Sequence, residues 1–243
     1  MGMLKISLPD GLLHEYASGI TVGEIVRNAY GKKSGAVAVL VNGEERDFSY
    51  VLEQDCDIEP ILGETEAGRY ILRHSCAHLL AQAVVEIYPE AQPTIGPPIE
   101  NGFYYDFKMD PVGDEDLKKI EKRMHEHVRA NHTLTREEHD NRTLRDMFAG
   151  NPFKIEIMND KIGMDIGSSA YRQGDFVDLC LGPHVPSTSY LRWFKLTGTS
   201  QAYWKGDSSK DSLVRIYGMC FSSKDELRAV SYTHLTLPTI LLV

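Results

Sequence analysis

The sequence predicts two consecutive α+β domains, a small one over residues 1–64 and a larger one over residues 65–229. In the small part, short β-rich segments lie on both sides of one helical segment. In the larger part, long helical segments are mixed with further short β-rich segments. Helices and strands mixed within each part are typical of α+β domains. A chain of 243 residues is long enough for two modest domains of this kind.

The small domain has local signals for most of its elements. Pro9-Asp10-Gly11 is typical of a turn, Thr21–Glu24 is a capping box that begins a helix, and Asn42-Gly43 is a hairpin signal. We expect strands over residues 4–8, 12–16, 36–41 and 57–61. Two strands, a helix and more strands predict a small module with a mixed sheet. Gly63–Gly68 is interpreted as the linker that follows it.

The larger domain begins with a helix over about residues 67–88, which Pro89 ends. A second long helix is expected over 114–131, because apolar residues recur there at intervals of three and four. The segment 94–106 is rich in turn-forming and aromatic residues. We also expect a short helix over 143–148, and strands over 153–158, 174–179, 194–197 and 212–218.

Composition narrows the class of protein. The 42% hydrophobic and 25% charged residues are ordinary for a globular protein, and no apolar run approaches the roughly 20 residues that a membrane helix needs. The four cysteines are scattered without a C-x-x-C pair, which favours a reducing, cytoplasmic setting without disulfides. The net charge of −9 does not itself suggest a nucleic-acid partner. Two basic clusters, over residues 118–129 and 192–215, nevertheless suit either phosphate contacts or ordinary solvated faces.

The last 14 residues, 230–243, differ from everything before them. They contain no Asp, Glu, Lys or Arg and follow a charged helical segment. Their sequence resembles translated adapter sequence at the end of a gene fragment. We therefore expect a non-native tail, with a genuine terminal strand as the alternative.

Two pairs of residues, one of two histidines and one of a cysteine and a histidine, suggest a chemical function. His74 and His78 are four residues apart on the first long helix, so both project from one face. Cys180 and His184 flank Gly182-Pro183 at the end of a predicted strand, where a turn can bring them together. Three interpretations remain open at this point: four unrelated residues, a tetrahedral zinc site, or a metal-free hydrolytic pocket.

The combination of these motifs resembles threonyl-tRNA synthetases of the bacterial type. The resemblance rests on H-x-x-x-H with C-x-x-x-H, on IGPPIENGFYYDF at 95–107, and on DLCLGPH at 178–184. It covers residues 3 to about 229. It implies a β-grasp, ubiquitin-like TGS domain over 1–64 and an editing domain over 65–229, of the type shared with alanyl-tRNA synthetases.

The resemblance implies hydrolysis of mischarged Ser-tRNA(Thr). A synthetic site for threonine gains only about 1–3 kcal/mol against serine, which lacks one methyl group, so a second site must remove the errors. Family resemblance makes His74, His78 and Lys154 the catalytic residues, with His74 and Lys154 nearest the attacking water. Lys154 is expected in the strand 153–158.

The same resemblance assigns the substrate-binding residues. Asp178 would bind the substrate ammonium, and Cys180 and His184 would line the serine pocket. Tyr104, with Tyr105 as the alternative, would offer a stacking face to the terminal adenosine of tRNA(Thr). The acceptor end of tRNA(Thr) is thus the expected partner, and no membrane partner is expected.

The resemblance also sets expectations about cofactors and about the whole protein. It favours editing without a cofactor, whereas His74, His78, Cys180 and His184 would be the ligands if zinc is bound. ATP and a catalytic zinc are expected only in an aminoacylation domain that this sequence lacks, and a homodimer only through missing domains. Two alternatives to this function remain open. One is a zinc-dependent trans-editing domain of the alanyl type, and the other is a non-catalytic TGS-bearing protein with an RNA-binding or regulatory role.

Overall fold

The computed structural model describes residues 2–31, 33–161 and 169–236, and it confirms the α+β class. The first domain contains β1 (Met3–Ser7), β2 (Leu13–Ala17), α1 (Val22–Tyr30), β3 (Ala36–Val41), β4 (Glu44–Arg46) and β5 (Cys56–Leu62). Its five strands form one mixed sheet in the order β2-β1-β5-β3-β4, with β1 and β5 parallel. Helix α1 packs on this sheet through buried Val22, Ile25 and Val26.

Local signals place the elements of the first domain as expected. The Thr21 hydroxyl accepts the Glu24 backbone N–H at 3.3 Å, and the Glu24 carboxylate accepts the Thr21 N–H at 3.0 Å, which completes the capping box. Asn42 and Gly43 have φ angles of 50° and 82°, as a two-residue hairpin between β3 and β4 requires. The four predicted strands and the helix are therefore confirmed.

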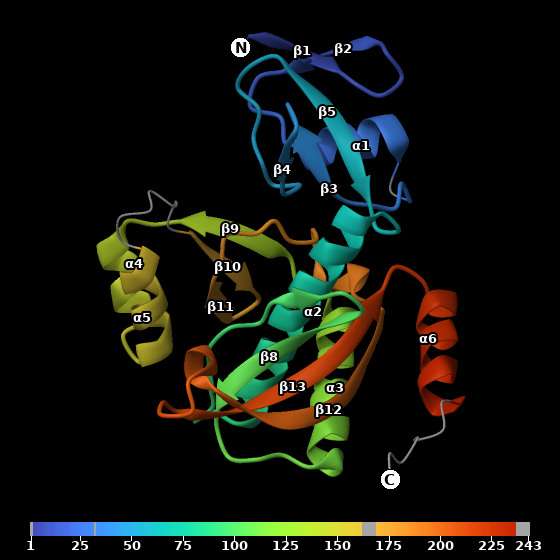
Figure 1. Cartoon of the computed structure of the whole chain (residues 1–243). Coiled ribbons are helices and arrows are strands. Elements are labelled where there is room, and N and C mark those ends of the chain that lie inside the picture. The colour runs from blue at the N-terminus through green and yellow to red at the C-terminus, as the bar shows by residue number, and fades with distance from the viewer. Residues whose placement is uncertain (1, 32, 162–168, 237–243) are drawn as a thin grey trace.

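The second domain is built around two long helices and an antiparallel sheet (Figure 1). Its elements are α2 (Glu66–Ile87), β6 (Gln92–Pro93), β7 (Pro98–Ile99), β8 (Gly102–Lys108), α3 (Asp114–Ala130), β9 (Leu134–Glu138), α4 (Asn141–Met147), α5 (Pro152–Lys161), β10 (Ser169–Gln173), β11 (Phe176–Leu179), η1 (Thr188–Tyr190), β12 (Trp193–Tyr203), η2 (Trp204–Gly206), β13 (Ser212–Phe221) and α6 (Lys224–Thr236). One sheet has the order β12-β13-β8-β6, with β7 paired to β8, and α2 and α3 pack against it. A separate sheet has the order β11-β10-β9.

The predicted strand over 153–158 is wrong, because this segment lies in helix α5. The Asn151 side chain accepts the backbone N–H groups of Phe153 and Lys154, and Pro152 occupies the first helical position. A capping asparagine followed by proline is a helix-start signal that outweighs the β-rich composition of the segment.

Three strands of five or more residues, β8, β9 and β10, lie where the sequence predicts none, in addition to the shorter β4, β6 and β7. The segment interpreted as turn- and aromatic-rich contains β8, in which Phe103, Tyr105 and Phe107 alternate toward the buried face. Strands β9 and β10 pair with each other. Their sequences are mostly polar, so they lack the alternation of apolar and polar residues that would predict a strand.

The C-terminal segment forms a helix where it was expected to break from the fold. Helix α6 continues through residues 230–236, and residues 237–243 lie outside the described residues. The foreign origin of the tail remains a prediction. Within the described residues, no helix combines the length and apolarity required to cross a membrane.

Gly68 lies where the two domains join, and it provides a test of that junction. A Cβ at Gly68 would lie 1.9 Å from the Leu62 carbonyl oxygen. Alanine normally stabilises a helix relative to glycine by about 1 kcal/mol. Because of the close approach, we predict that Gly68→Ala instead lowers the melting temperature by roughly 3–10 °C.

The control is Gly150→Ala, since a Cβ at Gly150 meets nothing within 4 Å. Thermal unfolding of both variants decides the matter. A melting temperature raised by Gly68→Ala would show that the junction is looser than the structure indicates.

Candidate functional site

Helix α2 positions the first histidine pair. The helix begins at the N-cap Thr65, whose side chain accepts the Gly68 N–H, and it passes through the centre of the second domain. His74 and His78 follow each other by one turn, with ring centroids 5.3 Å apart. The predicted projection of both rings from one face is therefore confirmed.

A tight turn after β11 positions the second pair. Gly182 has a φ of 73°, and a Cβ there would lie 1.8 Å from the Tyr171 hydroxyl oxygen. Only glycine fits this position, since both the left-handed backbone and the close approach exclude a side chain. The turn brings His184 back beside Cys180, as the sequence predicted.

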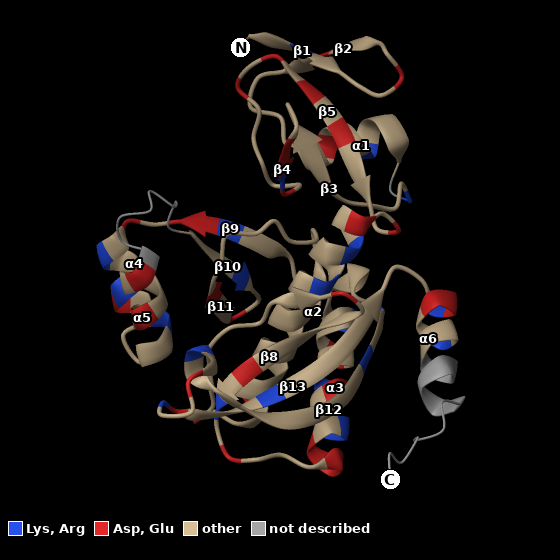
Figure 2. Cartoon of the chain, viewed as in Figure 1, with Lys and Arg blue, Asp and Glu red and all other residues tan. Residues whose placement is uncertain are grey.

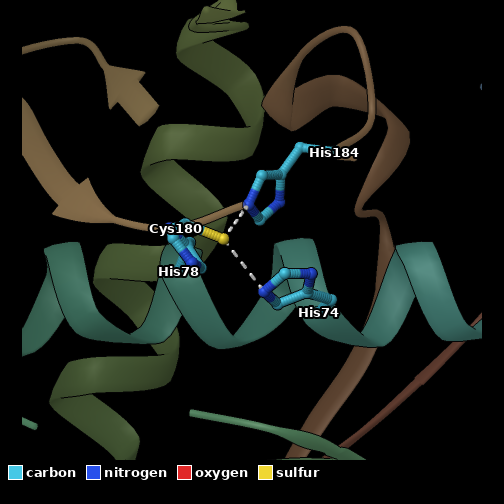
Figure 3. A group of neighbouring side chains, drawn as sticks. All are labelled: His74, His78, Cys180 and His184. Atoms are coloured by element: carbon cyan, nitrogen blue, oxygen red, sulfur yellow. Dashed lines mark hydrogen bonds between the residues drawn. The ribbon is translucent and has the colours of Figure 1, made fainter. Parts of the chain in front are cut away.

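The two pairs form a single cluster (Figure 3). The Cys180 Sγ lies 3.3 Å from the His74 Nε2 and 3.2 Å from the His184 Nε2. The His184 ring is 4.4 Å from the ring of His74 and 4.3 Å from the ring of His78, between centroids. The four side chains are thus assembled in one place, which excludes the interpretation that they are unrelated.

Ser75 holds His184 in this orientation. Its hydroxyl lies 3.0 Å from the His184 Nδ1 and also accepts the Val185 N–H at 3.1 Å. Because Ser75 occupies Nδ1, the Nε2 of His184 is directed toward Cys180. The sequence carried a weak signal for this role, namely a serine between the two helical histidines.

A buried ion pair lies beside the cluster. Lys154 forms a salt bridge with the Oδ1 of Asp178, and both side chains are almost completely buried. Tyr105 donates its hydroxyl to the Asp178 Oδ2 at 2.5 Å and accepts the Lys154 ammonium at 3.0 Å. The Nε2 of His78 lies 3.9 Å from the same carboxylate oxygen. Asp178 therefore links the ion pair to the histidines.

Burial sets the charge states of the cluster. Burial, and then the proximity of His78, lowers the pKa of His74 to about 3. Burial lowers the pKa of His78 to about 4 against the opposing effect of Asp178, and it holds the pKa of His184 well below its usual value. Burial raises the pKa of the Cys180 thiol to about 12. At neutral pH the cluster consists of three uncharged imidazoles and a thiol.

Asp178 is the charged exception. Burial raises its pKa, but the charge of Lys154, the proximity of His78 and the hydrogen bonds from Lys154 and Tyr105 outweigh that effect, so the pKa is lowered overall. The carboxylate is therefore ionised and compensated within the site.

The donor set fits a transition metal. One ligand atom from each of His74, His78, Cys180 and His184 lies within 4.8 Å of the others, as tetrahedral zinc requires. The Nε2 of His74 is directed into the cluster, and its buried Nδ1 has no hydrogen-bond partner among the residues that the structure describes. The geometry therefore leaves both the zinc interpretation and the metal-free interpretation open.

Tyr104 lies apart from this cluster. Adjacent residues of a strand point to opposite faces, so Tyr104 and Tyr105 diverge. The Tyr105 ring faces the core and is 1% exposed, so its faces are not available for stacking. Tyr104 lies on the other face of β8, where the Arg215 guanidinium is 3.8 Å from its ring centroid. Its expected contact with adenosine remains a prediction.

Helix α3 carries both basic and acidic residues (Figure 2), and the basic residues of the two clusters largely form ion pairs with acidic side chains. Pairs of opposite charge include Lys118 with Glu115, Lys119 with Asp116, Arg123 with Glu86, Lys195 with Glu121, Lys205 with Glu156 and Arg215 with Asp106. Such pairing favours the interpretation of these clusters as solvated faces.

Comparison with known proteins gives matches to both domains. A model of the TGS domain matches residues 4–61, and a model of the threonyl and alanyl tRNA synthetase second additional domain matches residues 169–217. The chain is 43% identical over 238 residues to a threonine–tRNA ligase of Pelobacter propionicus, covering 96% of this chain and 37% of that protein. Similar proteins include threonine–tRNA ligases of Marinobacter nauticus (44%, covering 96% and 36%) and Thermoplasma acidophilum (45%, covering 91% and 32%).

The chain corresponds to the N-terminal TGS and second additional domain region of threonyl-tRNA synthetases. It spans about a third of the length of these relatives. The matched part of the second additional domain contains Asp178, Cys180 and His184, whereas the helical histidines and Lys154 lie between the two matched segments. The cluster and its ion pair therefore depend on His74, His78 and Lys154, which lie outside both matched segments.

The uncharged histidines predict a pH dependence of stability. An unfolded histidine takes up a proton near pH 6.5, while His74 and His78 in the folded chain resist protonation down to about 3 and 4. The unfolded state thus binds more protons below about pH 6.5, so the free energy of unfolding should fall as the pH is lowered from there toward 4. Urea unfolding across this range measures the effect.

Removing one titrating ring makes the test specific. His78→Asn should reduce the decrease in the free energy of unfolding at low pH. The same change at His14, which is partly exposed in the TGS domain, should leave that decrease unchanged. NMR signals of the His74 and His78 rings that titrate near pH 6.5 would contradict the prediction.

Proposed function

We propose that this chain hydrolyses the ester of Ser-tRNA(Thr) at the cluster formed by His74, His78, Cys180 and His184. One observation carries the proposal: three uncharged imidazoles and a thiol adjoin a compensated Lys154–Asp178 pair in one buried place. Polar groups are costly to bury, so such a concentration is typical of a functional site.

Asp178 is suited to bind the amino group of the substrate. A carboxylate has about four positions that accept hydrogen bonds. Lys154, Tyr105 and the Leu179 N–H occupy three of them. The remaining position is on the side of His78, which lies 3.9 Å away. An aminoacyl ammonium bound there would place its ester beside the cluster.

The uncharged imidazoles are suited to position the attacking water. A neutral ring has one nitrogen that accepts a hydrogen bond, and His74 has its Nε2 directed into the cluster. Lys154 donates hydrogen bonds to Asp178 and Tyr105, so its role in the proposal is electrostatic: an ammonium beside the reaction stabilises the developing oxyanion. Cys180 and His184 then form the wall against which the substrate side chain packs. This wall is suited to serine and crowds the additional methyl group of threonine.

A zinc-dependent mechanism of the alanyl type is the second candidate, since the donor set favours it. His74, His78, Cys180 and His184 would hold the ion, and zinc would lower the pKa of a bound water. We favour the metal-free mechanism, because the N-terminal TGS domain places the chain with the threonyl relatives.

The remaining parts of the proposal concern the whole protein. We propose that tRNA(Thr) is the partner through its acceptor end, and that the region proofreads for a threonine–tRNA ligase. ATP, a catalytic zinc and dimerisation belong in this proposal to sequence beyond the matched third. A non-catalytic TGS-bearing binding protein would leave the buried cluster without a joint role.

The decisive experiment is deacylation of Ser-tRNA(Thr) and Thr-tRNA(Thr). Both esters carry the same tRNA, so selectivity for the serine ester must come from the side-chain pocket. We predict that the chain hydrolyses the serine ester and spares the threonine ester. His74→Ala and Lys154→Ala should lower the rate by on the order of 10²-fold, because they remove groups that position water or stabilise charge. The assay requires low salt, since a short region that contacts few phosphates binds tRNA weakly.

Two controls separate chemistry from folding. His14→Ala and Lys118→Ala change the same residue types away from the site and should retain the wild-type rate. Tyr105→Phe removes one hydroxyl from Asp178 while keeping the ring in the core, and it should slow hydrolysis without unfolding the chain. A wild-type chain that leaves the serine ester intact would overturn the proposed function. Equal hydrolysis of both esters would overturn only the proofreading role.

Metal content distinguishes the two mechanisms. We predict that exhaustive chelation leaves deacylation within about twofold of its starting rate, as general acid–base chemistry does not depend on an ion. Mass spectrometry reports metal bound per chain before and after chelation. Stoichiometric zinc whose removal abolishes hydrolysis, and whose return restores it, would select the zinc mechanism instead.

A further inference from the structure

The TGS domain contributes a side chain to the loop that carries half of the cluster. Asp47 follows β4 in the TGS domain, yet its side chain is 8% exposed and lies against the second domain. Its Oδ1 accepts the backbone N–H of His184 at 2.7 Å, and its Oδ2 accepts the Tyr171 hydroxyl at 2.6 Å. Both partners lie more than 120 residues further along the chain.

We propose that Asp47 is a positioning residue for the hydrolytic site and that this contact is a function of the TGS domain. The inference rests on the proposed function of the site. Asp47 touches no reacting group in this scheme. It acts through the backbone of His184 and through Tyr171, which together determine where the loop 180–184 lies.

The contacts of Asp47 belong to a larger network around this loop. Tyr171 packs its ring on His184, with centroids 4.4 Å apart, and its hydroxyl lies against Gly182. Arg136 donates to the Leu181 carbonyl oxygen at 2.8 Å. Burial raises the pKa of Asp47, and the hydrogen bonds from His184 and Tyr171, followed by the charge of Arg136, oppose that rise. The carboxylate thus has specific partners on the loop side.

The TGS side of the contact is equally well defined. The segment after Asp47 is bound by the first turn of α1: the Gly23 N–H donates to the Phe48 carbonyl oxygen and the Val22 N–H to the Tyr50 carbonyl oxygen, each at 2.9 Å. A Cβ at Gly23 would lie 2.8 Å from that Phe48 oxygen. The start of α1, defined by its capping box, therefore holds the Asp47 segment in place.

The site loop is consequently held from two sides. Ser75 on α2 binds the Nδ1 of His184 and the N–H of Val185, while Asp47 binds the N–H of His184 from the TGS domain. Loss of Asp47 would leave the His184 N–H and the Tyr171 hydroxyl buried without their acceptor, so the loop would shift to satisfy them. Because Cys180 and His184 lie on this loop, the shift would change the spacing of the cluster.

A purely structural contact between domains predicts something different. It would lower stability on removal but leave the rate unchanged at temperatures where the variant is folded. A positioning role predicts a lower kcat with little change in KM, since small displacements of reacting groups cost rate while the remaining tRNA contacts persist. The two roles are therefore distinguishable.

The experiment compares Asp47→Ala and Asp47→Asn in the complete chain with Asp57→Ala. Asp57 is an exposed carboxylate of the same TGS domain and serves as the matched control. We expect Asp47→Ala to lower kcat for Ser-tRNA(Thr) by on the order of tenfold or more, with KM within about twofold. Asp47→Asn keeps one oxygen acceptor and should retain an intermediate rate, while Asp57→Ala should match the wild type. Tyr171→Phe removes the other end of the Oδ2 contact, and its effect should not add to that of Asp47→Ala.

An NMR measurement makes the test independent of activity. The His184 amide signal should move in Asp47→Ala and remain in place in Asp57→Ala, because only the former loses its acceptor. If Asp47→Ala does not fold, Asp47→Asn and Tyr171→Phe decide the matter by the same two readouts.

The outcomes separate this inference from the proposed function. Wild-type kcat with an unmoved His184 signal in folded Asp47→Ala would overturn the positioning role, as would a lower melting temperature with unchanged kcat. If the wild type itself does not hydrolyse the ester, the proposed function fails. In that case a moved His184 signal still supports Asp47 as the residue that positions the loop, and an unmoved one overturns it.

Discussion

The burial of helix α2 is the constraint on which the rest of this structure depends. Every residue from Ser75 to Val84 is buried, so the middle of the helix has no face directed to water. A polar group on such a helix must find its partner inside the protein. Ser75 binds His184 and Val185, His78 faces Asp178, and the Gln82 side chain binds that of Gln173. The segments that pack against α2 must supply these hydrogen-bond and charge partners. The site lies where such segments contact the helix.

The same burial explains why the site tolerates a full ion pair. An isolated buried charge costs several kcal/mol, whereas a close pair with additional hydrogen bonds offsets much of that cost. Lys154 and Asp178 form such a pair, and Tyr105 bridges them. Burial lowers the pKa of each histidine, at His78 against the opposing effect of Asp178, so the rings remain uncharged at neutral pH. One environment thus produces a charged pair and an uncharged cluster side by side, which would suit separate roles in the proposed hydrolysis.

The sequence predicts those elements that depend on interactions between residues close together in the chain. The capping box at Thr21, the hairpin at Asn42-Gly43 and the long helices appear as expected, because each depends on residues within one or two turns. The apolar residues around Lys154 predict a strand, whereas the Asn151-Pro152 helix start determines the structure of this segment. The cluster was predictable from its two motifs, but Asp47 was not. Its role follows only from contacts across more than 120 residues, and its surroundings in the sequence resemble any exposed turn.

The packing of the two domains is reflected in the sequence of one strand. The strand β3 reads Ala-Val-Ala-Val-Leu-Val, without the alternation of polar and apolar residues that a half-exposed strand shows. In the structure Val39 and Val41 pack in the core of the TGS domain, whereas Val37 and Ala38 join the core around α2. A strand buried on both faces needs a partner on each, and the second partner here is the helix that carries His74 and His78. The TGS domain is therefore part of the packing of the site helix as well as of the site loop, so the two domains are coupled both through apolar burial and through the carboxylate of Asp47.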